Sequence, residues 1–267
     1  MKVLFFGDTF GKPGRDAVRA FIAEARTSLA PDAIIVNCEN FAHGRGVLPE
    51  QVEEFLGLGV DVLTTGNHVW DQKTLLSYIG GQPRLLRPIN FPEHTRISVP
   101  GRGMIVLPAS GARRAPLGVV QIMGRVHMEA VDCPFRAADA AIERFKSEGV
   151  KSIIVDFHAE ATSEKQAIAH FLDGRVSAVV GTHSHVQTAD ARILKNGTAA
   201  ITDVGLCGVF DSVIGVRKEA SIARFLSRVP SPFEPADGQG GVSAALITID
   251  EATGKATAIE RIYKEKV

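Results

Sequence analysis

Two short polar segments carry the side chains of this sequence best suited to chemistry. Gly181-Thr182-His183-Ser184-His185 follows the apolar run Val176–Val180, and Gly66-Asn67-His68 follows a run that ends at Thr65. In extended backbone, the i, i+2 spacing of His183 and His185 would point both rings to one side. Side chains at the carboxyl ends of parallel strands converge in one crevice. The two segments therefore predict a site for metal chemistry.

Further potential ligands follow other apolar runs in the same way. The full set is Asp8, Glu39, Asn40, Asn67, His158, His183 and His185. Seven ligands are more than one ion needs, whereas two divalent ions roughly 3.5–4 Å apart would use this mixture of carboxylate, amide and imidazole well. Such a pair shares a bridging carboxylate and a bridging hydroxide, and Glu39 is the candidate bridge.

The charge of such a centre indicates its substrate class. Two divalent ions beside Asp8 and Glu39 leave a formal charge of about +2, or about +1 with hydroxide bound. A phosphate ester suits this field, because the hydroxide can attack phosphorus while both ions neutralise the phosphate oxygens. His68 is the candidate general acid for the departing oxygen.

The elements that would position these residues alternate between strands and helices. Strands are expected over 2–6, 33–36, about 60–65, 152–156 and 176–180, with amphipathic helices between them. Ser163 and Gln166 have capping-box spacing for one helix start. Turn pairs at Asn196-Gly197 and Thr253-Gly254 predict two antiparallel hairpins, and Pro230–Gly241 is the most loop-like segment. We expect a single α/β domain over residues 1–267, a sandwich of two mixed sheets flanked by helices.

Composition narrows the classes of function and location. Lys plus Arg equals Asp plus Glu at 30 each, so overall charge does not support an interaction with RNA. The early apolar run Val3–Phe6 is too short for a signal-peptide core, and no later run approaches membrane-spanning length. We therefore expect a cytoplasmic protein without a membrane partner, and a homo-oligomer as the common default. Cys38, Cys133 and Cys207 lack metal-type spacing and fit reduced thiols.

Longer motifs carry a resemblance to a known family. They are Gly7-Asp8, Asn37-Cys38-Glu39-Asn40, Ala42-His43-Gly44, Gly66-Asn67-His68-Val69-Trp70-Asp71, Arg87-Pro88, the segment 156–164, the segment 181–190 and Thr202-Asp203-Val204-Gly205. Through them the chain resembles the calcineurin-like metallophosphoesterases nearly end to end. It resembles more closely their YmdB-like branch, which contains bacterial phosphodiesterases acting on 2′,3′-cyclic nucleotides.

The resemblance implies a ligand set for each ion. Asp8, Glu39, Asn40 and His185 would hold the first, and Glu39, Asn67, His158 and His183 the second. Phe10 stands where the wider superfamily has the histidine of an Asp-x-His motif. Glu39-Asn40 stands where the superfamily has a Gly-Asp motif. In both departures the sequence resembles the YmdB-like branch. An amide in place of an imidazole hardens the first site, so iron is expected first, with manganese and zinc as alternatives.

Several alternatives stay open from the sequence. The main hypothesis is a dinuclear phosphodiesterase that opens 2′,3′-cyclic nucleotides; the others are a phosphomonoesterase and a metal-dependent regulatory protein that binds a nucleotide or RNA. His43, in a glycine-flanked loop, would either form a turn or contact substrate. For Asp156 and Glu160, a strand end and a solvated carboxylate are favoured over orientation of the His158 imidazole.

Overall fold

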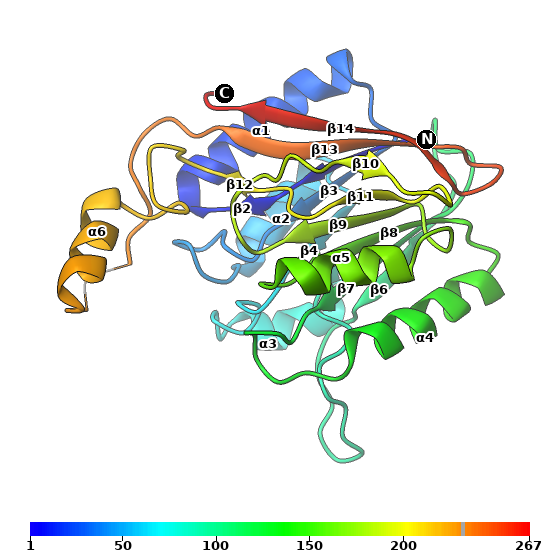
Figure 1. The fold of residues 1–267 in the computed structure, drawn as a ribbon, viewed down its shortest axis with the longest axis horizontal. Coiled ribbons are helices and arrows are strands. Elements are labelled where there is room, and N and C mark those ends of the chain that lie inside the picture. The colour runs from blue at the N-terminus through cyan, green and yellow to red at the C-terminus, as the bar shows by residue number, and fades with distance from the viewer. Residues whose placement is uncertain (231–232) are drawn as a thin grey trace.

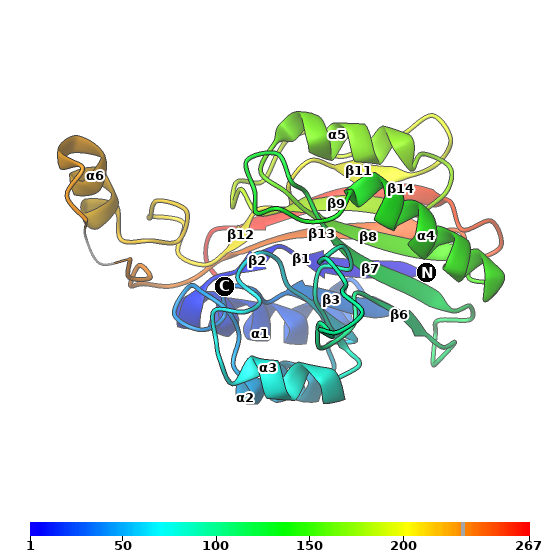
Figure 2. The same ribbon diagram turned by 90° about the horizontal axis from the view of Figure 1, so that it is seen from below.

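The computed structural model describes residues 1–230 and 233–267, and its core is two stacked β-sheets with helices outside them. Figure 2 shows α1, α2 and α3 beneath one sheet and α4 and α5 above the other. Within the described residues each of these sheets has six strands. The expected α/β sandwich of two mixed sheets is confirmed.

The first sheet has the strand order β14-β13-β1-β3-β4-β5. Strands β1, β3, β4 and β5 run parallel, and β13 and β14 add an antiparallel hairpin. The bounds are β1 (Lys2–Phe6), β3 (Ala33–Asn37), β4 (Val62–Thr64), β5 (Leu85–Leu86), β13 (Val242–Ile249) and β14 (Ala256–Lys264).

The second sheet has the order β10-β11-β9-β8-β7-β6, with β7, β8, β9 and β11 parallel. Its bounds are β6 (Met104–Leu107), β7 (Leu117–Met123), β8 (Ser152–His158), β9 (Ala178–Thr182), β10 (Arg192–Ile193) and β11 (Ala199–Ile201). A short parallel pair, β2 (Asp8–Thr9) and β12 (Leu206–Cys207), lies beside the first sheet. Both predicted hairpins are present.

Strands that are apolar on both faces build the layers. In β1, Leu4 and Phe6 pack toward α1, while Val3 and Phe5 pack between the sheets. A continuous apolar run is typical of a strand covered on both faces, as β1 is. The helices of the body are α1 (Gly11–Ser28), α2 (Pro49–Gly57), α3 (Leu75–Tyr78), α4 (Pro134–Ser147) and α5 (Thr162–Phe171).

Two local features differ from the sequence-based expectation. Helix α5 begins at Thr162 after Ala161, with no side-chain cap, so the predicted capping box at Ser163 is wrong. Ser163 is exposed, whereas Glu164 is buried and accepts hydrogen bonds from the backbone N–H groups of Arg125 and Val126. The Glu164 carboxylate is therefore used to bind these backbone N–H groups, and the helix begins without a side-chain cap.

Helix α6 (Lys218–Ser227) was not predicted and stands away from the body (Figures 1 and 2). None of its residues is buried, so no apolar stripe is covered by the sheets. The described part of the expected loop Pro230–Gly241 has no helix and no named strand, and residues 231 and 232 lie outside the described residues. Among the described helices, none is both long and apolar enough to cross a membrane.

Candidate metal centre

The seven potential ligands meet where strands of both sheets end. Asp8 and Glu39 follow β1 and β3, Asn67 follows β4, and His158 is the last residue of β8. His183 follows β9 directly. The parallel strands therefore carry their polar ends to one edge of the sandwich, as the sequence predicted.

The carboxylates and imidazoles form two overlapping groups. Ligand atoms of Asp8, Glu39 and His185 lie within 4.8 Å of one another, and so do those of Glu39, His158 and His183. Glu39 is common to both groups, which is the position expected of a bridging carboxylate. The Asp8, Glu39 and His158 side chains are at most 1% exposed, so their charges need compensation inside the protein.

Each imidazole turns one nitrogen toward the centre because its other nitrogen is occupied. His158 Nδ1 lies 2.9 Å from Thr182 Oγ1, and His183 Nε2 lies 3.1 Å from a carboxylate oxygen of Glu160. His185 Nδ1 lies 2.8 Å from the carbonyl oxygen of Ile214. An outer acceptor of this kind fixes the tautomer of a ligand histidine and leaves the inner lone pair free for a metal.

The two amides also present oxygens to the centre. Asn67 Oδ1 lies 2.9 Å from His158 Nε2. The Asn40 amide nitrogen donates to Gly44 at 2.9 Å, while Asn40 Oδ1 is buried with no hydrogen-bond partner in the described structure. Asp8 Oδ1 is equally buried and unpartnered among the described residues. Buried acceptors without donors fit coordination of a cation.

The spacing within the second group also suits one ion. His158 Nε2 lies 3.2 Å from Glu39 Oε1 and 3.1 Å from His183 Nδ1. Ligand atoms that share an ion at bond lengths of about 2.1 Å stand roughly 3 Å apart. Gly66 leaves room for this cluster, since a Cβ there would meet Glu39 Oε2 at 2.2 Å and His158 Nε2 at 2.4 Å. The donor set and its spacing therefore fit metal ions.

The backbone between β9 and the centre is not extended, so the reason given for pairing His183 with His185 is wrong. Their φ angles are 105° and 63°, in the left-handed region that side-chain-bearing residues seldom adopt. Hydrogen bonds hold this conformation: the His183 N–H donates to Asp8 Oδ2 at 3.0 Å, and the Ser184 N–H donates to Asp203 Oδ2 at 3.0 Å. The two rings consequently enter different ligand groups, and such strain is common at functional sites.

Burial and mutual attraction set the charges of the metal-free centre. Burial alone would raise the pKa of Glu39, but the neighbouring imidazoles of His158, His68 and His183 lower it to about 2. Burial would lower the pKa of His158, but the carboxylates of Glu39, Asp8 and Asp156 raise it to about 9. Burial, followed by the charge on His158, lowers the pKa of His183 to about 3. The two shifts together favour an ionised Glu39 beside a protonated His158.

Asp156 and Glu160 lie where they can orient candidate ligand histidines, the less favoured expectation for them, although the Glu160 side chain is also 51% exposed. The Thr182 hydroxyl donates to Asp156 Oδ1 at 2.8 Å, so its oxygen is left to accept from His158 Nδ1. Glu160 contacts the His183 ring directly. The available signal for Glu160 was its position in the sequence, two residues after His158, the last residue of β8.

A cavity of about 310 Å³ opens onto the centre. His68 lines it together with Glu39, Asn40, His183 and His185, and its backbone N–H lies 3.3 Å from Glu39 Oε2. His68 Nδ1 lies 3.0 Å from Asp71 Oδ2, a contact that the sequence analysis did not identify. The Nε2 nitrogen is therefore the one free to meet a substrate.

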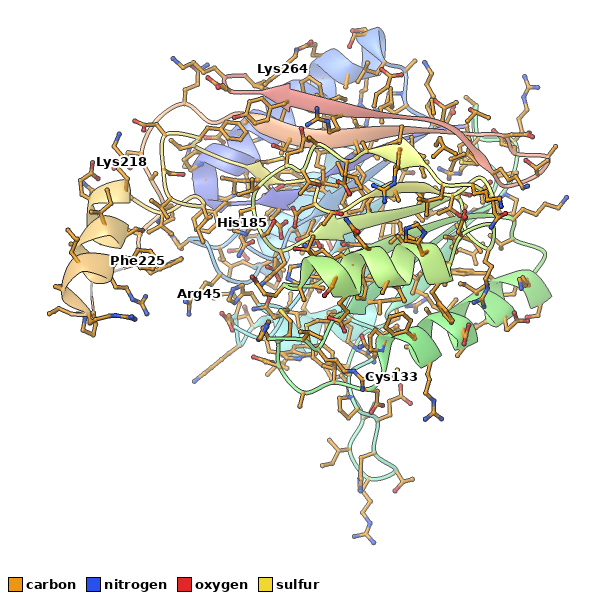
Figure 3. The ribbon with its side chains drawn as sticks, in the orientation of Figure 1. Arg45, Cys133, His185, Lys218, Phe225 and Lys264 are labelled. Atoms are coloured by element: carbon orange, nitrogen blue, oxygen red, sulfur yellow. The ribbon has the colours of Figure 1, made fainter. Side chains whose placement is uncertain are left out.

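His43 is exposed and lies outside the set of residues that line this cavity. Its φ of 54° places it in a left-handed turn, which agrees with the turn-forming alternative. The next residues, Gly44 and Arg45, do line the cavity. Figure 3 shows Arg45 and His185 on the side of the body that faces α6.

Comparison with known proteins identifies the family. The model of the YmdB-like protein family matches residues 4–262. The chain belongs to the YmdB-like family. It is 44% identical over 262 residues to the 2′,3′-cyclic-nucleotide 2′-phosphodiesterase of Bacillus subtilis strain 168, with 98% of this chain and 96% of the relative covered.

Solved structures agree with membership of the YmdB-like family. A novel phosphatase from Mycoplasma pneumoniae superposes with a TM-score of 0.89 at 34% identity, covering 99% of this chain and 93% of that one. A 5′-nucleotidase precursor from Thermus thermophilus gives a TM-score of 0.53 at 14% identity, covering 98% of this chain and 54% of that one, and shows the fold alone. The expectation of a phosphoesterase enzyme is confirmed.

Proposed function

We propose that this YmdB-like protein hydrolyses 2′,3′-cyclic nucleotides at a dinuclear metal centre. Asp8, Glu39, Asn40 and His185 would hold one ion, and Glu39, Asn67, His158 and His183 the other. The observation that carries this assignment is that Glu39 belongs to both ligand groups. The name of the Bacillus subtilis relative supports the cyclic nucleotide as substrate.

Donor chemistry narrows the choice of ions. Imidazole suits iron, zinc and other transition metals, whereas carboxylate and amide oxygens suit harder ions such as manganese. Iron is the first candidate for this mixed set, with manganese and zinc as alternatives. When bound, the ions would neutralise the phosphate oxygens and activate a water for attack on phosphorus.

The side chains around the centre have separable roles in this proposal. His68 lines the cavity and has Nδ1 engaged by Asp71, so its Nε2 would deliver a proton to the leaving oxygen. Hydrolysis would break the bond between phosphorus and the 2′-oxygen, which takes that proton, and leave a nucleoside 3′-phosphate. The choice of the 2′ bond rests on the name of the Bacillus subtilis relative.

Turnover of 2′,3′-cyclic AMP by the wild type and by His68→Ala, with bound metal quantified in both, tests this function. We expect kcat to fall about 10²- to 10⁴-fold at unchanged metal content, because a general acid contributes that much. His94→Ala is the matched control, since His94 is exposed and outside the centre. No wild-type turnover at full metal occupancy would overturn the proposal.

A simple phosphate monoester assayed under the same metal condition separates the phosphodiesterase from a phosphomonoesterase. This comparison is needed because the Mycoplasma pneumoniae structure is described as a phosphatase. A higher kcat/KM for the cyclic diester supports the proposal, and the reverse order favours the monoesterase.

A further inference from the structure

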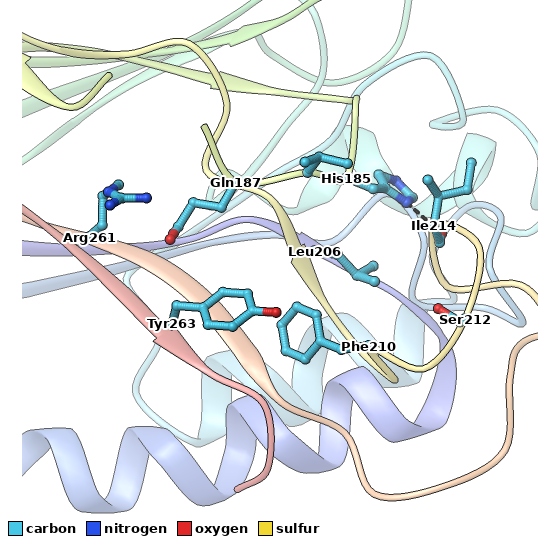
Figure 4. A pocket seen from close by; sticks show the side chains of 9 residues that line it. His185, Gln187, Leu206, Phe210, Ser212, Ile214, Arg261 and Tyr263 are labelled. Carbon is cyan, nitrogen blue, oxygen red and sulfur yellow. Dashed lines mark hydrogen bonds between the residues drawn. The ribbon is translucent and has the colours of Figure 1, made fainter. Parts of the chain in front are cut away.

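A second cavity, of about 600 Å³, lies next to the cavity of the metal centre (Figure 4). Its walls come from the segment after β9, from β12, from the loop that precedes α6 and from β14. Its volume lies within the range of about 300–1,000 Å³ typical of small-molecule sites. Of the seven candidate metal ligands and His68, His185 alone lines it.

The two cavities share a wall. His185 and Ile214 line both of them, and the hydrogen bond from His185 Nδ1 to the Ile214 carbonyl oxygen joins the two residues. The His185 ring thus lies close to the candidate ligands Asp8 and Glu39. The same residue also lines the larger cavity. The two cavities are therefore adjacent, and a group attached to a phosphate at the centre would reach the larger one by extending past His185 and Ile214.

The larger cavity has the lining of a site for a flat aromatic ring. Phe210 and Tyr263 pack with ring centroids 4.7 Å apart and tilted by 49°. Tyr263 is 51% exposed, so part of its ring is open to a ligand. Arg261 lies two residues earlier on β14, on the same face of the strand. An aromatic face beside an arginine is a common platform for stacking a nucleobase.

A fixed polar group stands opposite this aromatic pair. The Gln187 amide nitrogen donates to the carbonyl oxygens of Val204 at 3.1 Å, Ala244 at 3.3 Å and Ile262 at 3.2 Å. These three acceptors orient the amide, and its oxygen points toward the cavity in Figure 4. The site therefore offers both a stacking surface and a preorganised hydrogen-bond acceptor.

We infer that this second cavity receives the nucleobase of the cyclic nucleotide whose phosphate lies at the metal centre, with Tyr263 as the stacking residue. The inference rests on the proposed function. The smaller cavity, of about 310 Å³, takes the cyclic phosphate and the ribose. Arg261 and Gln187 border the base at its edges and position it.

The test compares a substrate with a base and one without it. KM and kcat are measured for 2′,3′-cyclic AMP and for 1-O-methylribose 2′,3′-cyclic phosphate, with wild type, Tyr263→Ala and Tyr263→Phe. For Tyr263→Ala we expect KM for the nucleotide to rise about tenfold, because stacking on an aromatic side chain contributes on this scale. Tyr263→Phe keeps the wild-type KM, and neither variant changes the kinetics of the base-free substrate.

Phe171→Ala is the matched control, because Phe171 is a partly exposed aromatic on α5 that does not line the cavity. An equal effect of Tyr263→Ala on both substrates, or no effect on either, overturns the base site while leaving the proposed function standing.

Binding separates the base site from turnover. The Kd of adenosine 3′-monophosphate and of inorganic phosphate is measured by calorimetry for wild type and Tyr263→Ala. Weaker binding of the nucleotide alone supports the base site even if the wild type hydrolyses no cyclic nucleotide, which would overturn only the proposed function. Unchanged binding of both ligands overturns the base site.

Discussion

His68 Nδ1 and Asp71 Oδ2 lie 3.0 Å apart in the turn that follows β4. Three other histidines have a similar partner on the nitrogen that faces away from the centre. Thr182 contacts His158, Glu160 contacts His183, and the Ile214 carbonyl oxygen contacts His185. The chain thus controls which nitrogen each ring presents. His68 differs because no ligand group includes it, so its free nitrogen is available to a substrate.

Replacing Asp71 tests this control. The amide in Asp71→Asn carries no negative charge, so it stabilises the proton-donating imidazolium form of the His68 ring less well than the carboxylate does. We expect kcat for 2′,3′-cyclic AMP to fall about 10- to 100-fold, the usual cost of losing a supporting partner, with bound metal unchanged. Asp139→Asn is the control, because Asp139 pairs with Arg175 on the surface. A wild-type kcat for Asp71→Asn would contradict the assigned role.

Metal uptake should release protons near neutral pH. Although burial opposes it, the carboxylates of Glu39, Asp8 and Asp156 raise the pKa of His158 from 6.5 to about 9 in the metal-free protein. A ligand imidazole must be neutral, so binding below pH 9 displaces about one proton, and metal affinity rises with pH until the pH reaches about 9. Titrating manganese in two buffers of different ionisation enthalpy measures this release. Identical heats in both buffers would show that no proton leaves.

The same shift gives the metal-free protein a pH-dependent stability. A raised histidine pKa contributes stability that is fully present below pH 6.5 and is lost as the pH rises through 9. We therefore expect the Tm of the metal-free protein to fall across this interval, while the metal-loaded protein, whose His158 is already neutral, shows no such component. Parallel thermal unfolding of the two forms checks this.

Much of the fold and the gathering of the candidate ligands could be predicted because β-strand periodicity and strand ends are local properties. Apolar runs such as those of β1 and β3 end at polar residues, and parallel pairing then carries Asp8 and Glu39 to one edge. The contact between Glu160 and His183 is different. It joins residues that follow different strands, so only the pairing of β8 with β9 brings them together.

The backbone conformation of His183 and His185 could not be predicted from the sequence either. Extended backbone was the simplest expectation for His183 and His185, and the actual positive φ angles depend on Asp8 and Asp203, which are distant in the chain. For helix α6 a signal was present but was not used: Ile222, Phe225 and Leu226 have helical spacing in the sequence, although no residue of the helix is buried in the structure.

A buried ion pair supports this strained segment and gives a stability prediction. Lys165 Nζ lies 2.6 Å from Asp203 Oδ2, with the side chains 3% and 1% exposed. Asp203 also accepts from the N–H groups of Ser184 and Gly205. Lys165→Met leaves that carboxylate buried without its cation, and we expect the free energy of unfolding to fall by about 3–5 kcal/mol.

Urea unfolding of Lys165→Met beside Lys218→Met provides the measurement. Lys218 pairs with Asp211 on the surface, where ion pairs contribute little. The same substitution there should leave the unfolding midpoint nearly unchanged. Equal midpoints for the two variants would mean that the buried pair does not stabilise the fold.

Replacing Gly66 tests whether the close packing of its backbone against Glu39 and His158 is needed for the metal centre. In Gly66→Ala, the new Cβ would overlap Glu39 Oε2 at 2.2 Å and the His158 ring at 2.4 Å, so a ligand or the strand end must move. Displacements of about 1 Å commonly cost about 10²-fold in rate, and we expect a loss of that size together with less bound metal. Gly57→Ala, where a Cβ meets nothing within 4 Å, should keep both. Since the new Cβ overlaps both Glu39, which belongs to both ligand groups, and His158, we expect the total metal content to fall in Gly66→Ala; unchanged metal content would contradict the assigned positions of these two side chains.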